Sequence, residues 1–151
     1  MNNKYKNVVI PVDLEHKSSW HNALPMALEF VRNNNAALHV ITVAANADIP
    51  AIAVHLPKDF DNHIRTQTET RLGQLVEQQV PADIAVQTAV GQGRIDKEIL
   101  RLAQQADADL IVMASHRPEL TDYLIGANAA HVMRHASCSV MVVRDQQGSA
   151  A

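Results

Sequence analysis

The sequence predicts an α/β fold in which an open, five-stranded parallel sheet lies between two layers of helices. Five short runs rich in β-branched residues alternate with four segments of helical periodicity, which gives the order βαβαβαβαβ. Several of these runs are apolar on both faces, as strands are when helices cover both sides of a parallel sheet. Right-handed crossovers then place helices on each face. The prediction is therefore a doubly wound, Rossmann-like three-layer sandwich.

The five expected strands are short runs in which β-branched and other apolar residues predominate. They cover residues 5–12, 37–43, 84–90, 110–114 and 139–143. The fourth run, LIVMA, is apolar at every position, which is typical of a strand covered on both faces. Asp107 and Asp109 mark the turn that leads into this strand.

Four helices are expected where apolar residues recur at helical spacing between these runs. The stripes consist of Ala23, Ala27, Leu28 and Val31; Ile64, Leu72, Leu75 and Val76; Ile95, Ile99, Leu102, Ala103 and Ala106; and Ala129, Val132, Met133 and Ala136. Ser18 and Ser19 are expected to cap the first helix, in which Pro25 removes one backbone hydrogen bond and introduces a kink. Pro81 is expected to end the second helix.

Length and composition indicate one domain whose core needs neither a metal nor a disulfide. The 151 residues fall within the usual size of a single domain, which we place at residues 1–146, followed by a disordered tail at 147–151. A single cysteine, Cys138, excludes an internal disulfide and fits the reducing cytoplasm, where we expect the protein to act. No apolar run reaches the length of about 18 residues that a membrane helix needs, so we expect no membrane insertion.

The composition excludes some partners and leaves room for others. With 13 basic and 16 acidic side chains, a net charge of −3 and only 3% aromatic residues, the chain has neither a basic footprint nor a base-stacking platform for nucleic acid. Residues 44–59 form the one long connection and are largely apolar, which indicates a lid or a contact surface.

Candidate ligand-binding residues follow from the fold. In a doubly wound sheet, ligands bind outside the carboxyl ends of the strands, where the strand order reverses. This rule selects Asp13, residues 43–46 and residues 115–117, which follow the first, second and fourth expected strands. The Asp13 carboxylate is a candidate acceptor for hydrogen bonds from a ligand amine or hydroxyl. A turn-forming or capping role is the alternative for this residue.

The segment after the fourth strand contains a candidate anion site. Ala114 and Ser115 leave the strand, His116 and Arg117 follow, and Gly126-Ala127-Asn128 is expected to open the last helix. Free backbone N–H groups at a helix start bind anions, and Arg117 and His116 add positive charge. The alternative is an ordinary helix start beside a solvated arginine.

Better-known phosphate and catalytic motifs do not occur in the sequence. The P-loop pattern GxxxxGK(S/T) is absent, and Gly91-Gln92-Gly93 follows the third strand without a third glycine, so we expect an ordinary strand-to-helix turn there. His131 and His135 lie four residues apart without a recognisable third metal ligand, so a surface pair is expected. Cys138 is expected to be a small buried hydrophobe. No nucleophile, base and orienting group occur together, and we expect no catalytic residues.

Two segments near the ends of the chain carry a more specific pattern. They are VVIPVD near the start and ASHRPELTDYLIGANAAHVMRHASCSVMVVR near the end. Through them the chain resembles the universal stress protein family, most of all its small bacterial F/G-type members. The resemblance implies the adenine nucleotide alpha hydrolase-like form of the fold and a homodimer paired through the last strands at Val140, Met141, Val142 and Val143. It also implies ATP or another adenine nucleotide, often with Mg²⁺, at the carboxyl end of the sheet.

The resemblance also implies which residues hold the nucleotide. Pro11, Val12, Asp13 and the backbone of Val40 are implied at the base and ribose, and Met113, Ala114, Ser115, His116, Arg117, Gly126, Ala127 and Asn128 around the phosphates. The family pattern is Gly-x2-Gly-x9-Gly-Ser/Thr, whereas this chain has Ala114, Arg117, a spacing to Gly126 that is one residue shorter, and Ala127 at the hydroxyl position. A hydrogen bond from that hydroxyl to a phosphate is worth about 1.5–3 kcal/mol, so Ala127 is expected to weaken binding.

The sequence and the resemblance together favour a small stress-response protein that acts as a nucleotide-dependent dimeric regulator, with at most very slow ATP hydrolysis. The alternative is a dimeric interaction or chaperone-like module that does not depend on a nucleotide. Ala127 and the apolar residues 44–56 favour this alternative. The sequence does not identify the protein partner in either case.

Overall fold

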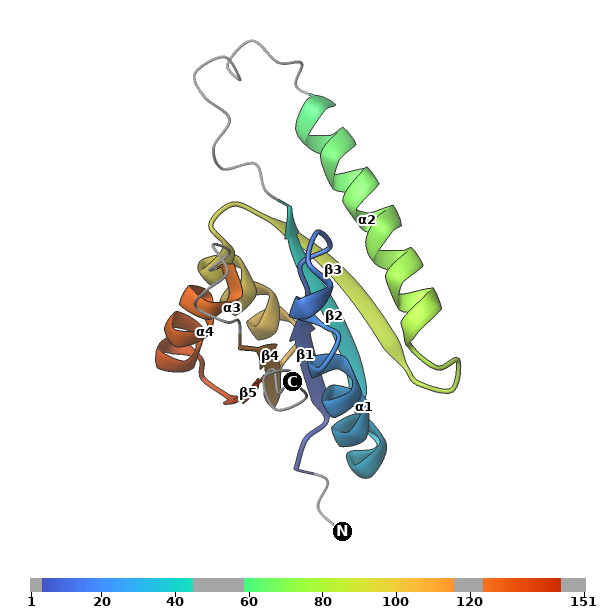
Figure 1. The fold of residues 1–151 in the computed structure, drawn as a ribbon, viewed down its shortest axis with the longest axis vertical. Helices are drawn as coiled ribbons and strands as arrows, with labels where there is room; N and C mark the ends of the chain where they lie inside the picture. The colour runs from blue at the N-terminus through green and yellow to red at the C-terminus, as the bar shows by residue number, and fades with distance from the viewer. Residues whose placement is uncertain (1–3, 45–58, 116–123, 145–151) are drawn as a thin grey trace, which may run out of the picture.

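The five strands form one parallel sheet in the computed structural model, which describes residues 4–44, 59–115 and 124–144, without the side chains of 59–61 and 124–127. The strands are β1 (Asn7–Pro11), β2 (Ala37–Ala44), β3 (Val86–Gln92), β4 (Leu110–Ala114) and β5 (Ser139–Val143). Their order in the sheet is β3-β2-β1-β4-β5, so the direction of winding reverses between β1 and β4 (Figure 1). The predicted doubly wound α/β fold is confirmed.

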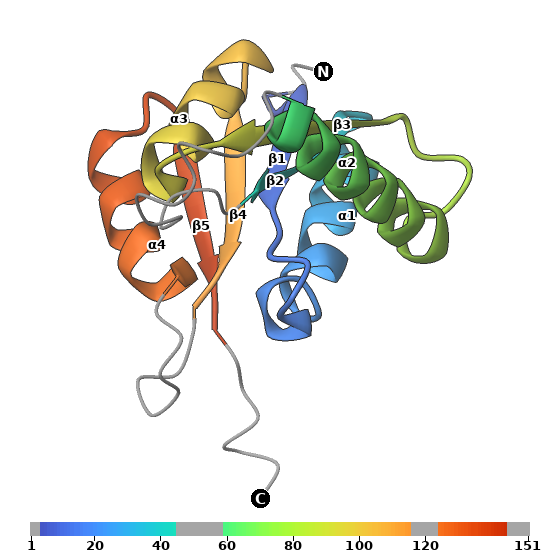
Figure 2. The same ribbon diagram turned by 90° about the horizontal axis from the view of Figure 1, so that it is seen from above.

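Four α-helices in the described chain cover the sheet, two on each face. They are α1 (Ala23–Asn34), α2 (Asp59–Gln79), α3 (Ile95–Gln105) and α4 (Leu124–His135), and a short 3-10 helix, η1 (Lys17–Ser19), precedes α1. Helices α1 and α2 lie on one side of the sheet, and α3 and α4 lie on the other (Figure 2). Among the described helices, none combines the length and the apolar character that crossing a bilayer requires.

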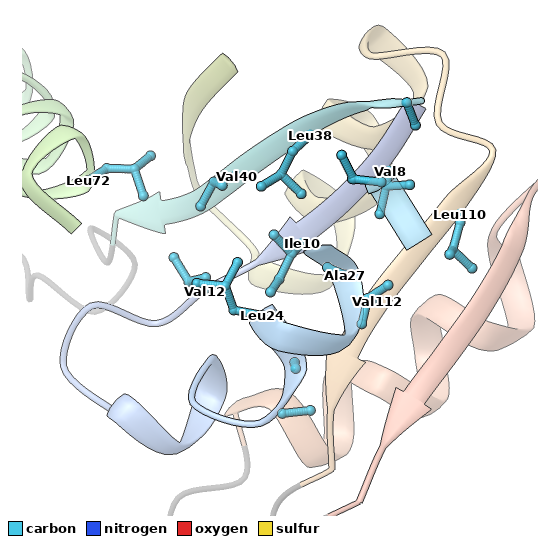
Figure 3. Close-up of a cluster of buried hydrophobic side chains, with 14 of the residues drawn as sticks. Val8, Ile10, Val12, Leu24, Ala27, Leu38, Val40, Leu72, Leu110 and Val112 are labelled. Carbon is cyan, nitrogen blue, oxygen red and sulfur yellow. The ribbon is translucent and has the colours of Figure 1, made fainter. Parts of the chain in front are cut away.

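Two apolar clusters, one on each face of the sheet, hold the three layers together. Successive residues of a strand point to opposite faces, so Val8 and Ile10 of β1 enter one cluster and Val9 enters the other. Figure 3 shows the first cluster, where strand side chains meet Leu24 and Ala27 of α1. The second cluster joins Ile111 and Met113 of β4 to α3 and α4; the helix residues are Ile99, Leu102, Ala103, Ala129 and Val132.

Strand and helix bounds agree with the sequence where the apolar pattern is continuous. β4 and β5 begin and end as predicted. β3 begins two residues later than expected, because Ile84 still belongs to the turn after α2, where its N–H donates to the carbonyl of Pro81 at 3.1 Å. Helix α2 extends beyond the predicted stripe of 64–76 at both ends, since its polar ends carry no apolar period that would reveal them.

The prediction that Ser18 and Ser19 cap the first helix is wrong. Helix α1 begins at Ala23, after Asn22, and the buried Ser19 hydroxyl instead bonds to the preceding turn. Pro25 is therefore the third residue of α1, in the first turn, where a backbone N–H has no partner within the helix. A kink at Pro25 is expected only if the helix begins at Ser18. Because α1 begins at Ala23, Pro25 lies in its first turn and gives no reason for a kink.

The last helix also starts earlier than predicted. Gly126 was expected to open it, but α4 begins at Leu124. Gly126 is the third helical residue and still belongs to the turn whose N–H groups lack partners within the helix. The apolar connection predicted at 44–59 lies outside the described residues except for its two ends, and the predicted tail at 147–151 lies wholly outside them.

The start of β1 is fixed by a residue from a distant part of the chain. Oδ2 of Asp109 accepts hydrogen bonds from the backbone N–H groups of Lys6 and Asn7, at 2.8 and 2.9 Å. The backbone N–H of Asp109 in turn donates to the carbonyl of Asn7 at 2.9 Å. Asp107 takes a left-handed conformation, with φ of 52°. Both aspartates therefore form the turn into β4, as predicted.

Gly91-Gln92-Gly93 is the strand-to-helix turn that the sequence predicts. Gly93 has a φ of +126°, which favours glycine, and a Cβ at Gly91 would lie 2.8 Å from Oε1 of Glu98. That oxygen accepts the backbone N–H of Gln92 at 3.1 Å, and both carboxylate oxygens of Glu98 bind Arg101 at 2.8 and 2.9 Å. The glycines therefore admit a carboxylate that ties the end of β3 to α3.

Replacing Glu98 by glutamine is expected to lower stability by about 1–3 kcal/mol at neutral pH and to make stability less sensitive to acid. The hydrogen bond from Arg101 lowers the pKa of Glu98 below its ordinary value of 4.5, against the opposing effect of burial. The contribution of Glu98 is therefore complete above pH 4.5 and is lost as the pH falls below it. Urea unfolding at pH 7 and pH 3.5 measures this, with the exposed Glu77→Gln as the control. Equal loss of stability on acidification in wild type and Glu98→Gln would contradict the assignment.

Candidate functional site

A cavity of about 340 Å³ lies at the carboxyl ends of β1 and β2. Residues of α2 and of α3 contribute to its walls. Its lining consists of Pro11, Val12, Asp13, Leu14, Glu15, His16, Thr42, Val43, Ala44, Ile64, Thr68, Arg71, Ile95 and Ile99. Apolar side chains predominate, and the polar side chains come from the turn after β1, from β2 and from α2. This combination is typical of sites for small organic ligands.

The turn after β1 holds Asp13 at the cavity in a fixed orientation. Oδ1 of Asp13 accepts the N–H of Glu15 at 2.9 Å, and Oδ2 lies 2.9 Å from Nδ1 of His16. The Ser19 hydroxyl accepts the N–H of Asp13 at 2.8 Å and donates to the carbonyl of His16 at 2.7 Å. Asp13 thus shapes the turn, as one of the two interpretations predicts. Its side chain also lines the cavity, and its contact with a ligand stays a prediction.

Thr42 joins the carboxyl ends of β1 and β2 beneath the cavity. Its hydroxyl is buried and donates to the carbonyl of Val12 at 2.7 Å, while the N–H of Val12 donates to the carbonyl of Ile41 at 2.8 Å. These bonds hold the two strands together just beyond the end of β1. Hydrogen bonds therefore fix the two strands relative to each other at the floor of the cavity.

An ion pair links the turn after β1 to α2 at the cavity. Nη1 of Arg71 lies 2.7 Å from Oε1 of Glu15, and both side chains are substantially exposed. Ile64, Thr68 and Arg71 recur at helical spacing and so present one face of α2 to the cavity. The described lining carries two carboxylates, of Asp13 and Glu15, the guanidinium of Arg71 and the imidazole of His16, so this end of the cavity has no excess of positive charge.

The structure brings part of the predicted site together. Pro11, Val12 and Asp13 line the cavity. Val40 lies further inside β2, with a side chain that is 1% exposed in the core, so it has a place in a site only through its backbone. Met113 and Ala114 are buried at the end of β4, and the N–H of Ser115 donates to the carbonyl of Val143 at 2.8 Å. None of these three is among the cavity residues, so the described cavity lies on the β1–β2 side of the point where the strand order reverses.

The second half of the predicted site is only partly described. His116 and Arg117 lie outside the described residues. Gly126, Ala127 and Asn128 belong to α4, and of these the structure describes the side chain of Asn128, which is half-buried.

Sequence reasoning missed the helical wall residues of the cavity. The rule that selects residues after strands does not select residues on helix faces, so it does not predict Thr68 or Arg71. Ile64, Ile95 and Ile99 belong to the predicted apolar stripes of their helices, and the structure places them at the cavity. The available signal was the spacing of Thr68 and Arg71, four and seven residues after Ile64, on the same face of α2.

The remaining candidates lie away from this cavity. Nε2 of His131 lies 3.2 Å from Oδ2 of Asp96, and the rings of His131 and His135 stack with centroids 4.3 Å apart. Within the described ranges, no three histidine, cysteine or acidic side chains are grouped to hold a metal ion. Cys138 is half-buried, and burial and the charge of Asp109 raise the pKa of its thiol, which favours the protonated, unreactive form.

Comparison with known sequences decides the family. The sequence model of the universal stress protein family matches residues 4–144. The chain belongs to this family. Universal stress protein G of Salmonella typhimurium is 29% identical over 143 residues, which cover 93% of this chain and 99% of that protein. The resemblance noted in the sequence is thereby confirmed.

Solved structures of universal stress proteins share the fold. The protein UspA from Lactobacillus plantarum superposes with a TM-score of 0.66 at 20% identity, over 95% of this chain and all of that one. An Arabidopsis thaliana family member with AMP bound gives a TM-score of 0.59 at 16% identity, over 97% and 95% of the two chains. A universal stress protein in complex with cAMP gives 0.56 at 22% identity, over 93% and 97%.

Proposed function

We propose that this universal stress protein binds an adenine nucleotide at the carboxyl end of its sheet and acts as a nucleotide-dependent dimeric regulator in the stress response. The observation that carries the proposal is the cavity beside Asp13, at the carboxyl ends of β1 and β2. It lies at the edge of the sheet where the fold rule places a ligand, next to the point where the strand order reverses. Two family members of the same fold, one with AMP and one with cAMP, support the choice of ligand class.

The described cavity fits the base and the ribose. Its volume of about 340 Å³ is within the range of small-molecule sites, and its apolar walls suit a planar base. The Asp13 carboxylate suits the donors of such a ligand, which are an exocyclic amine and ribose hydroxyls. The proposed contacts at this end are Pro11, Val12, Asp13 and the backbone of Val40.

The phosphates are proposed to point away from this end of the cavity. The carboxylates of Asp13 and Glu15 repel them, whereas N–H groups in the first turn of α4 attract them. The proposed contacts there are Met113, Ala114, Ser115, His116, Arg117, Gly126, Ala127 and Asn128. Mg²⁺ commonly binds through phosphates and one or two carboxylates, so it needs no protein cage.

The proposed action depends on occupancy and not on turnover. A nucleotide that binds only the folded protein stabilises it by mass action and shifts it toward the state that a partner recognises. The dimer is proposed to form through Val140, Met141, Val142 and Val143, which are all half-buried on β5 at the edge of the sheet. We propose that the protein acts in the cytoplasm on a protein partner and does not catalyse a reaction beyond very slow ATP hydrolysis.

Mass spectrometry and calorimetry test the proposal directly. The protein is denatured and its supernatant analysed for a co-purified nucleotide, and the ligand-free protein is then titrated with ATP, with and without Mg²⁺. Binding in either experiment supports the proposal. The absence of both a co-purified nucleotide and a heat of binding would favour the nucleotide-independent interaction module. Ala127, which lacks the hydroxyl of the family pattern, favours the same alternative.

Replacing Ala127 by serine is expected to tighten nucleotide binding about tenfold, because a hydroxyl that donates to a phosphate is worth about 1.5–3 kcal/mol, part of which is spent on ordering the side chain. Calorimetry with ATP measures the gain, and adenosine provides the control because it has no phosphate. Equal tightening for both ligands, or none for ATP, would show that the first turn of α4 does not contact phosphate.

A further inference from the structure

Among the described residues, Asp96 is the one charged residue that is buried, with 4% of its surface exposed. Oδ1 accepts a hydrogen bond from Nε of Arg94 at 2.9 Å, and Oδ2 lies 3.2 Å from Nε2 of His131. Burial raises the pKa of Asp96, but hydrogen bonds from Arg94 and the N–H of Lys97, with the charges of Arg94 and His131, outweigh burial and lower the pKa overall. An ionised carboxylate therefore lies between α3 and α4.

The contact between Asp96 and His131 joins two parts of the proposed site. Asp96 is in the first turn of α3, which also presents Ile95 and Ile99 to the cavity. His131 is in α4, whose first turn contains Gly126. We propose that Asp96 is a positioning residue of the nucleotide site, which holds α4 against α3 through the imidazole of His131 and makes nucleotide affinity depend on pH. This inference rests on the proposed function.

The charge of His131 sets the strength of this contact. A protonated imidazole donates a charge-assisted hydrogen bond to a carboxylate, which is stronger than the bond from a neutral N–H. Histidine side chains change charge between about pH 5 and 8. Among described groups, the charged and titratable neighbours of His131 are Asp96 across the helix interface, Arg94, which pairs with Asp96, and His135 on the same helix. The apolar neighbours Ala129 and Val132 carry no charge.

The consequence for binding follows from the position of α4. When the contact weakens at alkaline pH, α4 occupies its binding-competent position for a smaller fraction of the time. Apparent affinity falls in proportion to that fraction. Affinity is therefore expected to be higher in mild acid, with His131 protonated, and to decrease as the pH rises.

Titration with ATP and Mg²⁺ at pH 6 and pH 8 tests this inference. The wild type is expected to lose about fivefold more affinity across this interval than His131→Gln, from the difference between charge-assisted and neutral hydrogen bonds. His131→Lys keeps a positive charge at both values and is expected to show no such loss. His21→Gln, which replaces an exposed histidine outside α3 and α4, is the control and is expected to keep the wild-type profile. Protonation of the nucleotide itself affects all variants equally and cancels in the comparison.

Asp96→Asn completes the test, because it keeps the shape of the side chain and removes its charge. It is expected to weaken binding at pH 6 to the level of His131→Gln. Wild-type affinity in Asp96→Asn, or a wild-type pH profile in His131→Gln, would overturn the inference while leaving the proposed function in place. No binding by the wild type at either pH would overturn both. Circular dichroism checks folding, and the His131 variants decide the question if Asp96→Asn does not fold.

Discussion

The proposed dimer is expected to dissociate into monomers when Val142 is replaced by proline. β5 is an edge strand, and the N–H of Ser115 donates to the carbonyl of Val143. In a parallel strand, alternate residues direct their backbone groups to opposite sides, so Val143 and Met141 bond to β4 while Val142 faces the open edge. Proline at position 142 therefore removes a donor that pairs between subunits and leaves the β4–β5 hydrogen bonds intact.

The loss occurs twice in a twofold dimer. Taking about 1 kcal/mol for each lost hydrogen bond, the association constant is expected to fall at least about thirtyfold. Sedimentation equilibrium at several protein concentrations measures the change. A wild type that is monomeric at every concentration would contradict the dimer itself.

The opposite edge of the sheet provides a matched control. Nη2 of Arg65 donates to the carbonyl of Val90 in β3, so Val90 and Thr88, two residues earlier, direct their backbone groups to the open edge. Thr88→Pro is therefore the same change on the other edge strand and is expected to leave the dimer intact. Dimers that persist in Val142→Pro but dissociate in Thr88→Pro would show that β3 is the interface.

Replacing Asp13 by asparagine is expected to weaken adenine nucleotide binding about ten- to a hundredfold, because a hydrogen bond to a charged group is worth about 1.5–3 kcal/mol. The side chain is 18% exposed at the cavity, and its Oδ1 position still accepts the N–H of Glu15 after the change. The turn is therefore expected to keep its conformation. Calorimetric titration with ATP measures the loss.

Two comparisons make the Asp13 test specific. Glu15→Gln changes a carboxylate of the same cavity that is 68% exposed and paired with Arg71, and it is expected to have little effect on affinity. Binding of 2′-deoxy-ATP separates the two kinds of donor: if Asp13 holds the ribose, the missing hydroxyl weakens binding to wild type but not to Asp13→Asn. Wild-type affinity in Asp13→Asn would show that the carboxylate does not contact the ligand.

Features that depend on local pattern were predictable from the sequence. The bounds of β4 and β5 follow from continuous apolar runs, and the turn at Gly91 and Gly93 follows from glycine itself. The role of Ser19 was not predictable in this way, because its partners lie upstream in a turn whose shape depends on the Asp13 side chain. A serine before a helix is an ordinary cap signal, and here a tertiary arrangement overrides it.

The candidate site likewise contains residues that a local pattern predicts and residues that depend on the packing of the helices. Asp13 was found because it directly follows an apolar strand, and the fold rule needs only that position. Thr68 and Arg71 belong to the site because α2 packs along the sheet in one particular direction, which the sequence pattern does not specify. Asp96 contacts His131 of a different helix, and the local sequence shows only an acidic residue in a first helical turn.

The position of β1 in the middle of the sheet has a consequence for how the chain assembles as it is synthesised. One edge of β1 pairs with β2, which follows it closely, whereas the other edge pairs with β4. The backbone N–H groups of Lys6 and Asn7 likewise have their acceptor, the carboxylate of Asp109, only after that residue has been synthesised. A nascent chain that ends before Asp109 therefore carries an apolar strand with an open edge, and that strand needs protection from other chains until the ribosome has made the second half of the sheet.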